Sequence, residues 1–91
     1  MERMTRLNRD GSASIIKEAL DNGQAARRLA CLEDFLTYLQ ARRTDLPSEL
    51  ERLRRQNAVK TFRFRELMTE RMTNELIWDL LRRFGIPDEG E

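Results

Sequence analysis

Apolar residues recur every three or four positions through most of the chain, and no stretch alternates steadily between apolar and polar residues. This periodicity is typical of amphipathic helices rather than strands. The first helical segment lies between Ser12 and Gly23, where either Ser12 or Ser14 can cap its start. Gly23 can end it, because glycine accepts the left-handed conformation at a helix end. Its apolar face consists of Ile15, Ile16, Ala19 and Leu20.

A second helix is predicted from Gln24 to Arg43, with two apolar stripes side by side. One stripe follows a 4-3-4-3 spacing, and its members are Ala25, Leu29, Leu32, Leu36 and Leu39. The other consists of Cys31, Phe35 and Tyr38. Together they exceed the roughly 100° of apolar surface that is usual for a surface helix. We therefore expect this helix to be contacted from two sides, with Cys31 as a small core residue.

A boundary is predicted at residues 44–48, because Pro47 suits a first helical turn. Ser48 and Glu51 have the spacing of a capping box. No proline or glycine follows until Gly85, so one long helix is expected over about 48–84. Gly85 and then Pro87 would end it.

The apolar residues of the 48–84 segment form two faces that are almost opposite at about 100° per residue. The first face contains Leu50, Leu53, Phe64, Leu67 and Met68, with Asn57 among them. The second contains Val59, Phe62, Leu76, Ile77, Leu80, Leu81 and Phe84. A straight helix would expose one of these faces unless something covered both. Either the helix breaks, at 57–61 or at 69–74, or its second face packs on another subunit or another protein.

These elements predict an all-α fold, a small three- to four-helix bundle with a long, straight or kinked, C-terminal helix over about 48–84. A chain of 91 residues is the size of one domain at most. We expect a flexible N-terminal arm over 1–11, a single helical domain over 12–86 and an acidic tail over 87–91.

Composition excludes several kinds of catalytic site. Without histidine there is no Ser-His-Asp triad, Cys-His dyad or imidazole metal ligand. The lone Cys31 can form neither an intramolecular disulfide nor a cysteine zinc site, and it suits a reducing compartment. Carboxylate pairs at i,i+4, such as Glu66 with Glu70, are read as solvated helix faces. We therefore expect a cytoplasmic protein that is not an enzyme, with no cofactor, no metal and no membrane segment.

A basic stretch over residues 52–65 contains no acidic residue. Its cations are Arg52, Arg54, Arg55, Lys60, Arg63 and Arg65, and two phenylalanines are interleaved with them. Cations hold phosphates, and aromatic rings stack on unpaired bases. The turn before Ser48 also has the spacing of a helix-turn-helix. Against this function, the formal net charge is only +1 and residues 66–91 are acidic.

Leu50, Leu53 and Asn57 also fit the a, d and a positions of a short parallel zipper, in which a buried Asn fixes register. The alternative is an ordinary amphipathic helix with Asn57 at its end.

Helical domains of this size often complete their core by forming oligomers. We therefore expect a homodimer, or a complex with another protein. The residues expected at the interface are Val59, Phe62, Ile77, Trp78, Leu80 and Phe84, although a core position is the more frequent role of tryptophan. The function expected is a non-enzymatic helical protein-interaction module that acts as an adaptor, inhibitor or regulator. The alternative is a nucleic-acid-binding regulator that uses the basic stretch.

Overall fold

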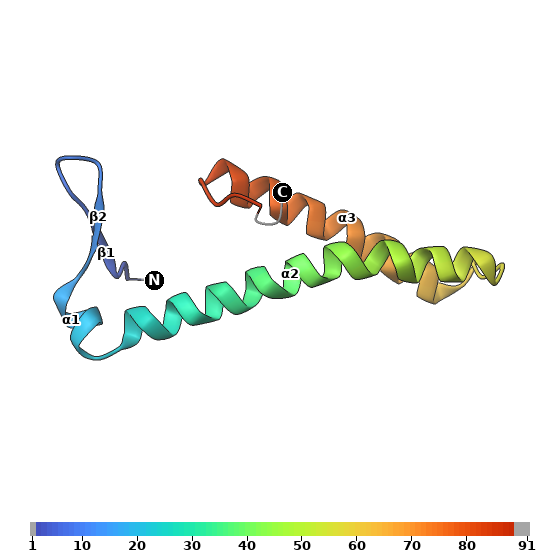
Figure 1. Cartoon of the computed structure of the whole chain (residues 1–91), viewed down its shortest axis with the longest axis horizontal. Coiled ribbons are helices and arrows are strands. Elements are labelled where there is room, and N and C mark those ends of the chain that lie inside the picture. The colour runs from blue at the N-terminus through green and yellow to red at the C-terminus, as the bar shows by residue number, and fades with distance from the viewer. Residues whose placement is uncertain (1, 89–91) are drawn as a thin grey trace. The chain divides into compact units, whose positions relative to one another are not determined.

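The structure, a computed structural model, describes residues 2–88 and divides the chain into two compact units, 1–37 and 38–91. Along residues 2–88 the elements are β1 (Thr5–Leu7), β2 (Ala13–Ile15), α1 (Lys17–Asp21), α2 (Gln24–Arg55) and α3 (Phe62–Arg83), as Figure 1 shows. The expectation of a mainly helical chain is therefore confirmed. The predicted bundle is not formed. The first unit contains α1 and the part of α2 up to residue 37, and the second contains a hairpin of the rest of α2 with α3.

The first unit begins with an antiparallel pair of short strands, in which Arg6 lies opposite Ser14. The turn between them is closed by a hydrogen bond from the Asn8 amide to the Ser12 carbonyl, at 2.8 Å. Asp10 accepts hydrogen bonds from the Ser12 hydroxyl at 2.6 Å and from its amide at 2.9 Å, and these bonds lower the pKa of Asp10. Part of the expected flexible arm is thus paired as a strand.

The start predicted for the first helix is wrong, because α1 begins only at Lys17. Ser12 and Ser14 bond to Asn8 within the hairpin turn instead of capping a helix. Such local side-chain bonds offer serine an alternative to the helix N-terminus. The predicted end is confirmed: Gly23 adopts a φ of 75°, a left-handed conformation that suits glycine.

The predicted boundary at Pro47 and Ser48 is also wrong, since α2 continues through both residues to Arg55. An internal proline costs a helix about 3 kcal/mol, because it has no N–H to donate. Leu46 and Leu50 lie on either side of it and are 1% and 0% exposed. Burying each leucine side chain contributes roughly 1.5–3 kcal/mol. The packing of a continuous helix therefore outweighs the cost of the proline.

The long helix predicted over 48–84 is broken at the first of the two sites considered, between α2 and α3. Asn57 has a φ of 57°, which reverses the chain after the last turn of α2. Thr61 then caps α3: its hydroxyl accepts a hydrogen bond from the Phe64 amide at 3.2 Å. The zipper interpretation is therefore wrong, because Asn57 lies in the turn and occupies no helical core position.

The core of the second unit lies between α2 and α3. Leu46, Leu50 and Leu67 are buried together, and the half-buried side chains packed against them are Leu53, Phe64 and Met68. The first apolar face identified in the sequence thus folds against itself across the turn. At its other end α3 stops as predicted, because Gly85 adopts a φ of 91°.

Candidate interaction surfaces

The side chain of Arg42 joins the two helices of the second unit. Its Nε donates to Glu70 Oε2 at 2.6 Å, and its Nη1 donates to Glu49 Oε1 at 3.1 Å. Its Nη2 reaches the second oxygen of each carboxylate, at 3.3 Å. Such forked, charge-assisted pairs are the strong ones. The guanidinium lowers the pKa of Glu49, and the two carboxylates raise the pKa of Arg42.

A second group of ion pairs fastens the segment that follows α3. The side chain of Asp88 is only 1% exposed. Its Oδ2 accepts from Arg43 Nη1 at 2.5 Å and from Arg82 Nη1 at 2.8 Å. Arg43 also lies over the ring of Trp78, 5.3 Å from its centroid. Asp88 was assigned to an acidic tail, yet it is part of the hairpin packing; residues 89–91 of that tail lie outside the described residues.

A small recess between α2 and α3 is lined in part by Arg42, Arg43, Asn74 and Trp78. The Nδ2 of Asn74 and the Nε1 of Trp78 are buried and donate to no described protein group. The guanidinium groups of Arg42 and Arg43 are already bound to carboxylates. The recess therefore belongs to the polar packing of the hairpin. Within residues 2–88 no group of three or more potential metal ligands gathers.

The outer face of α3 carries an exposed apolar row. Met72, Leu76 and Leu80 follow one another at i, i+4 and i+8, and they are 66%, 64% and 52% exposed. The residues of α3 that are buried are Leu67, Asn74 and Trp78. At about 100° per residue, the exposed row lies almost opposite the buried one. We call Met72, Leu76 and Leu80 the outer row of α3.

The structure separates the residues predicted for an interface. Val59, Phe62, Leu80 and Phe84 are exposed, and Ile77 is half-buried. Trp78 is 1% exposed and packs within the hairpin, so it offers no surface to a partner. Sequence reasoning missed Met72. The spacing of the outer row would have indicated it, once α3 was known to begin after the turn at 57–61.

Within the first unit, α2 exposes a further set of apolar side chains. Leu29, Leu32 and Phe35 are 56%, 52% and 41% exposed. Cys31 is also exposed. The predictions that this helix is contacted from two sides and that Cys31 is a core residue are therefore wrong for the single chain. The two apolar stripes exist, but within the described residues the folded chain buries only Leu39 completely and leaves Ala25 and Leu36 half-buried.

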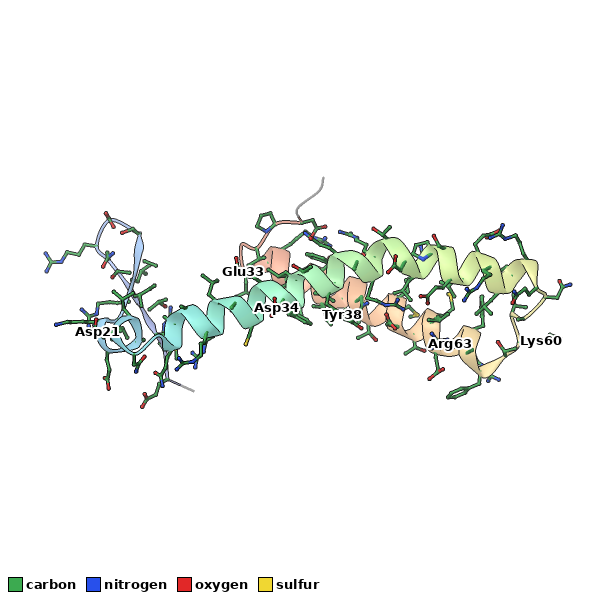
Figure 2. The ribbon with its side chains drawn as sticks, turned by 60° about the horizontal axis from the view of Figure 1, so that its bottom comes forward. Asp21, Glu33, Asp34, Tyr38, Lys60 and Arg63 are labelled. Carbon is green, nitrogen blue, oxygen red and sulfur yellow. The ribbon has the colours of Figure 1, made fainter. Side chains whose placement is uncertain are left out.

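The predicted cations of residues 52–65 gather at the turn of the hairpin, and we call this segment the basic tip. Arg54 lies over the ring of Phe64, 5.6 Å from its centroid, and Arg63 lies 3.7 Å from a carboxylate oxygen of Glu66. The other cations form no ion pair with any described residue; they are Arg52, Arg55, Lys60 and Arg65. Figure 2 labels Lys60 in the turn and Arg63 at the start of α3.

The helix-turn-helix interpretation of this region is wrong, because the turn that it needs before Ser48 is part of the continuous α2. The basic tip is instead a reversal between two antiparallel helices. Its aromatic residues also differ: Phe64 is half-buried against the core, whereas Phe62 is 74% exposed.

Comparison of the chain with protein-family models, with curated proteins and with solved structures gives no match. Among residues 2–88, no helix combines the length and the apolar content that a membrane crossing requires. The two candidate interaction surfaces of the described residues are the outer row of α3 and the basic tip.

Proposed function

We propose that this protein is a non-enzymatic helical interaction module, an adaptor, inhibitor or regulator, that forms a homodimer through the outer row of α3. The observation that supports this proposal is the row itself. Met72, Leu76 and Leu80 are all more than half exposed although they lie in the middle of a well-formed helix. Covering side chains of this kind contributes roughly 1.5–3 kcal/mol each when burial is complete.

The balance between core and surface supports the same proposal. Six apolar residues are buried within residues 2–88, whereas fourteen large apolar side chains are exposed there. Single exposed apolar residues are ordinary on a protein surface, but a contiguous row is typical of an interaction site. Small domains with too little core commonly complete it by association.

A second copy of the chain is the partner that the charges beside the outer row favour. Arg71, Glu75 and Asp79 run parallel to the row, each one position before a row residue. Arg71 pairs with no carboxylate among the described residues, whereas Asp79 already accepts from Arg82 Nη2 at 2.6 Å. In a two-fold antiparallel pairing of two α3 helices, Arg71 of one copy would lie near Asp79 of the other. Each such pair would be formed twice, because a two-fold interface repeats every contact.

We place this module in the cytoplasm, because Cys31 is a free and exposed thiol. Reducing conditions keep such a thiol from forming disulfides between chains.

The proposal is tested by light scattering during size exclusion, with the wild-type chain and Leu76→Glu. We expect the wild type to have the mass of a dimer and the variant to have the mass of a monomer, since the carboxylate would be buried unpaired. Circular dichroism should show the same helix content for both, because Leu76 is 64% exposed in the single chain.

The matched control is Gln56→Glu, which adds the same charge to the exposed turn of the hairpin. It should remain a dimer. A wild-type chain that is monomeric at high micromolar concentration would overturn the proposal. A dimer that survives Leu76→Glu would show that another surface, such as the exposed residues of α2, joins the two copies.

A further inference from the structure

The basic tip concentrates positive charge in a chain whose formal net charge is only +1. We propose that the basic tip binds single-stranded nucleic acid, with its unpaired cations on the phosphates and Phe62 stacked on a base. This inference goes beyond the proposed dimer and does not depend on the outer row of α3.

The fold leaves these cations available while it neutralises others in the same unit. Arg42, Arg43 and Arg82 are each held by carboxylates at 2.5–3.3 Å. In contrast, the four unpaired cations of the tip are exposed and form no ion pair with a described residue; they are Arg52, Arg55, Lys60 and Arg65. Arg52 acts on Glu49 through its charge but forms no direct ion pair with it. Cations that no carboxylate binds directly remain able to displace counterions from phosphates.

The backbone at the tip adds to this positive potential. The first turn of α3 contains no acidic residue; the Thr61 hydroxyl accepts from the amide of Phe64, and the Thr61 carbonyl accepts from the amide of Arg65. The positive end of the helix dipole is therefore not neutralised by a carboxylate of its own turn, as it is in many helices. Arg63 and Arg65 stand in that turn instead. A phosphate is the kind of group that such an end attracts.

Phe62 supplies the contact that distinguishes a single strand from other polyanions. Its ring is 74% exposed at the first position of α3, between the cations of the turn and those of the helix. Exposed aromatic rings beside arginines are the platforms on which unpaired bases stack. A duplex fits less well, because residues 66–91 carry seven acidic residues and three basic ones. A rigid duplex lying along α3 would be repelled, whereas a flexible strand can contact the tip alone.

The test measures the fluorescence anisotropy of labelled single-stranded DNA and RNA oligonucleotides of mixed sequence with the full chain. Four phosphate contacts predict a slope of log affinity against log salt of about −2.8. Binding should therefore weaken roughly 50-fold between 50 and 200 mM salt. DNA and RNA should behave alike, since the phosphodiester and the stacked base are common to both.

Two variants with the same net charge distinguish binding by the basic tip from attraction to the overall charge of the chain. The first replaces the four unpaired cations: Arg52→Gln, Arg55→Gln, Lys60→Gln and Arg65→Gln. The second replaces four exposed cations elsewhere that have no ion pair among the described residues: Arg6→Gln, Arg9→Gln, Lys17→Gln and Arg83→Gln. The tip variant should lose at least about 100-fold in affinity, and the other variant less than about threefold. Circular dichroism should show that both remain helical.

A third variant, Phe62→Ala, tests the stacking. It should weaken binding roughly tenfold and leave the salt slope unchanged, because it removes no charge. An unchanged affinity would overturn the role of Phe62.

Three outcomes would overturn the whole inference. One is the absence of oligonucleotide binding at 50 mM salt. Another is an equal loss of affinity in the two charge variants, which would show attraction to net charge alone. The third is binding to vesicles of phosphatidylserine without binding to either oligonucleotide, which would identify the tip as a membrane-surface site.

Discussion

Arg42 and Glu49 form a forked ion pair across Pro47. The two residues lie two turns apart on α2, and the distances from Arg42 Nη1 and Nη2 to the carboxylate oxygens are 3.1 Å and 3.3 Å. Pro47 has no N–H to donate to the turn before it, so the helix is locally weaker at this point. The ion pair spans that weak point. The same guanidinium holds Glu70 of α3, so one side chain stabilises both the continuity of α2 and the hairpin.

Replacing Arg42 should therefore destabilise the second unit. Arg42→Met removes the fork and leaves Glu49 and Glu70 without their common counterion, and we expect the free energy of unfolding to fall by about 2 kcal/mol. Arg42→Lys keeps the charge but loses the planar fork, so we expect a loss of about 1 kcal/mol. Urea denaturation measures both. Arg55→Met, at an exposed cation with no ion pair among the described residues, should stay within about 0.5 kcal/mol of the wild type. Equal stabilities of the two Met variants would contradict the stabilising role of the Arg42 ion pairs.

The pH dependence of stability should reveal the contribution of the ion pair between Arg42 and Glu49. The guanidinium of Arg42 holds the pKa of Glu49 below its ordinary value of 4.5. The stability linked to Glu49 is therefore fully present above that value and is lost as the pH falls through the lowered pKa. Glu49→Gln should be less stable than the wild type at pH 7, and its stability should decline less steeply between about pH 5 and pH 3.

The matched control for this titration is Glu33→Gln, at an exposed residue of α2 with no ion pair among the described residues. Its stability at pH 7 should stay within about 0.5 kcal/mol of the wild type. Thermal unfolding at a series of pH values measures all three chains. Parallel curves for Glu49→Gln and the wild type would refute the contribution of Glu49.

Two leucines of α2 should differ sharply in their contribution to stability. Leu50 is 0% exposed within the core of the hairpin, whereas Leu32 is 52% exposed. Leu50→Ala should cost about 2–5 kcal/mol, because it removes buried methyl groups and leaves a cavity. Leu32→Ala should cost less than about 1 kcal/mol in the dilute, monomeric chain. Denaturation at low protein concentration measures both losses of stability. Similar losses for the two variants would contradict the position of the core around Leu50.

The turn between α2 and α3 should be sensitive to the residue at position 57. Asn57 has a φ of 57°, where a side chain other than asparagine or aspartate is strained. Asn57→Ala should cost about 1 kcal/mol, and Asn57→Gly should remain within about 0.5 kcal/mol of the wild type. Gln56→Ala is the matched neighbour and should have little effect. Equal stabilities of the two Ala variants would show that the turn does not hold this conformation in solution.

Several elements could be predicted from local chemistry. Gly23 and Gly85 end helices as expected, because glycine has no Cβ and enters the left-handed region without strain. The two opposed apolar faces of 48–84 indicated a break, and 57–61 was one of the two places considered. The basic tip was also visible as a run of cations without acids, and the structure places it at an exposed turn.

Other elements depended on contacts between residues far apart in the sequence. Pro47 and Ser48 have the local chemistry of a helix start, yet Leu46 and Leu50 pack against Leu67, seventeen residues or more further along. Cys31 is likewise exposed, because no described segment packs over it. The periodicity of apolar residues alone cannot show which segments pack together.

Residue types and their spacing thus determined that the chain is mainly helical, where two of its helices end and where its positive charge gathers. These properties depend on the backbone preferences and charges of neighbouring residues. Only the tertiary structure decided that α2 passes through Pro47, that Trp78 is buried and that the outer row of α3 stays exposed. The physical reason is that burial of a side chain depends on which distant segment packs against it, and the free energy of that packing exceeds the local preference of a single residue.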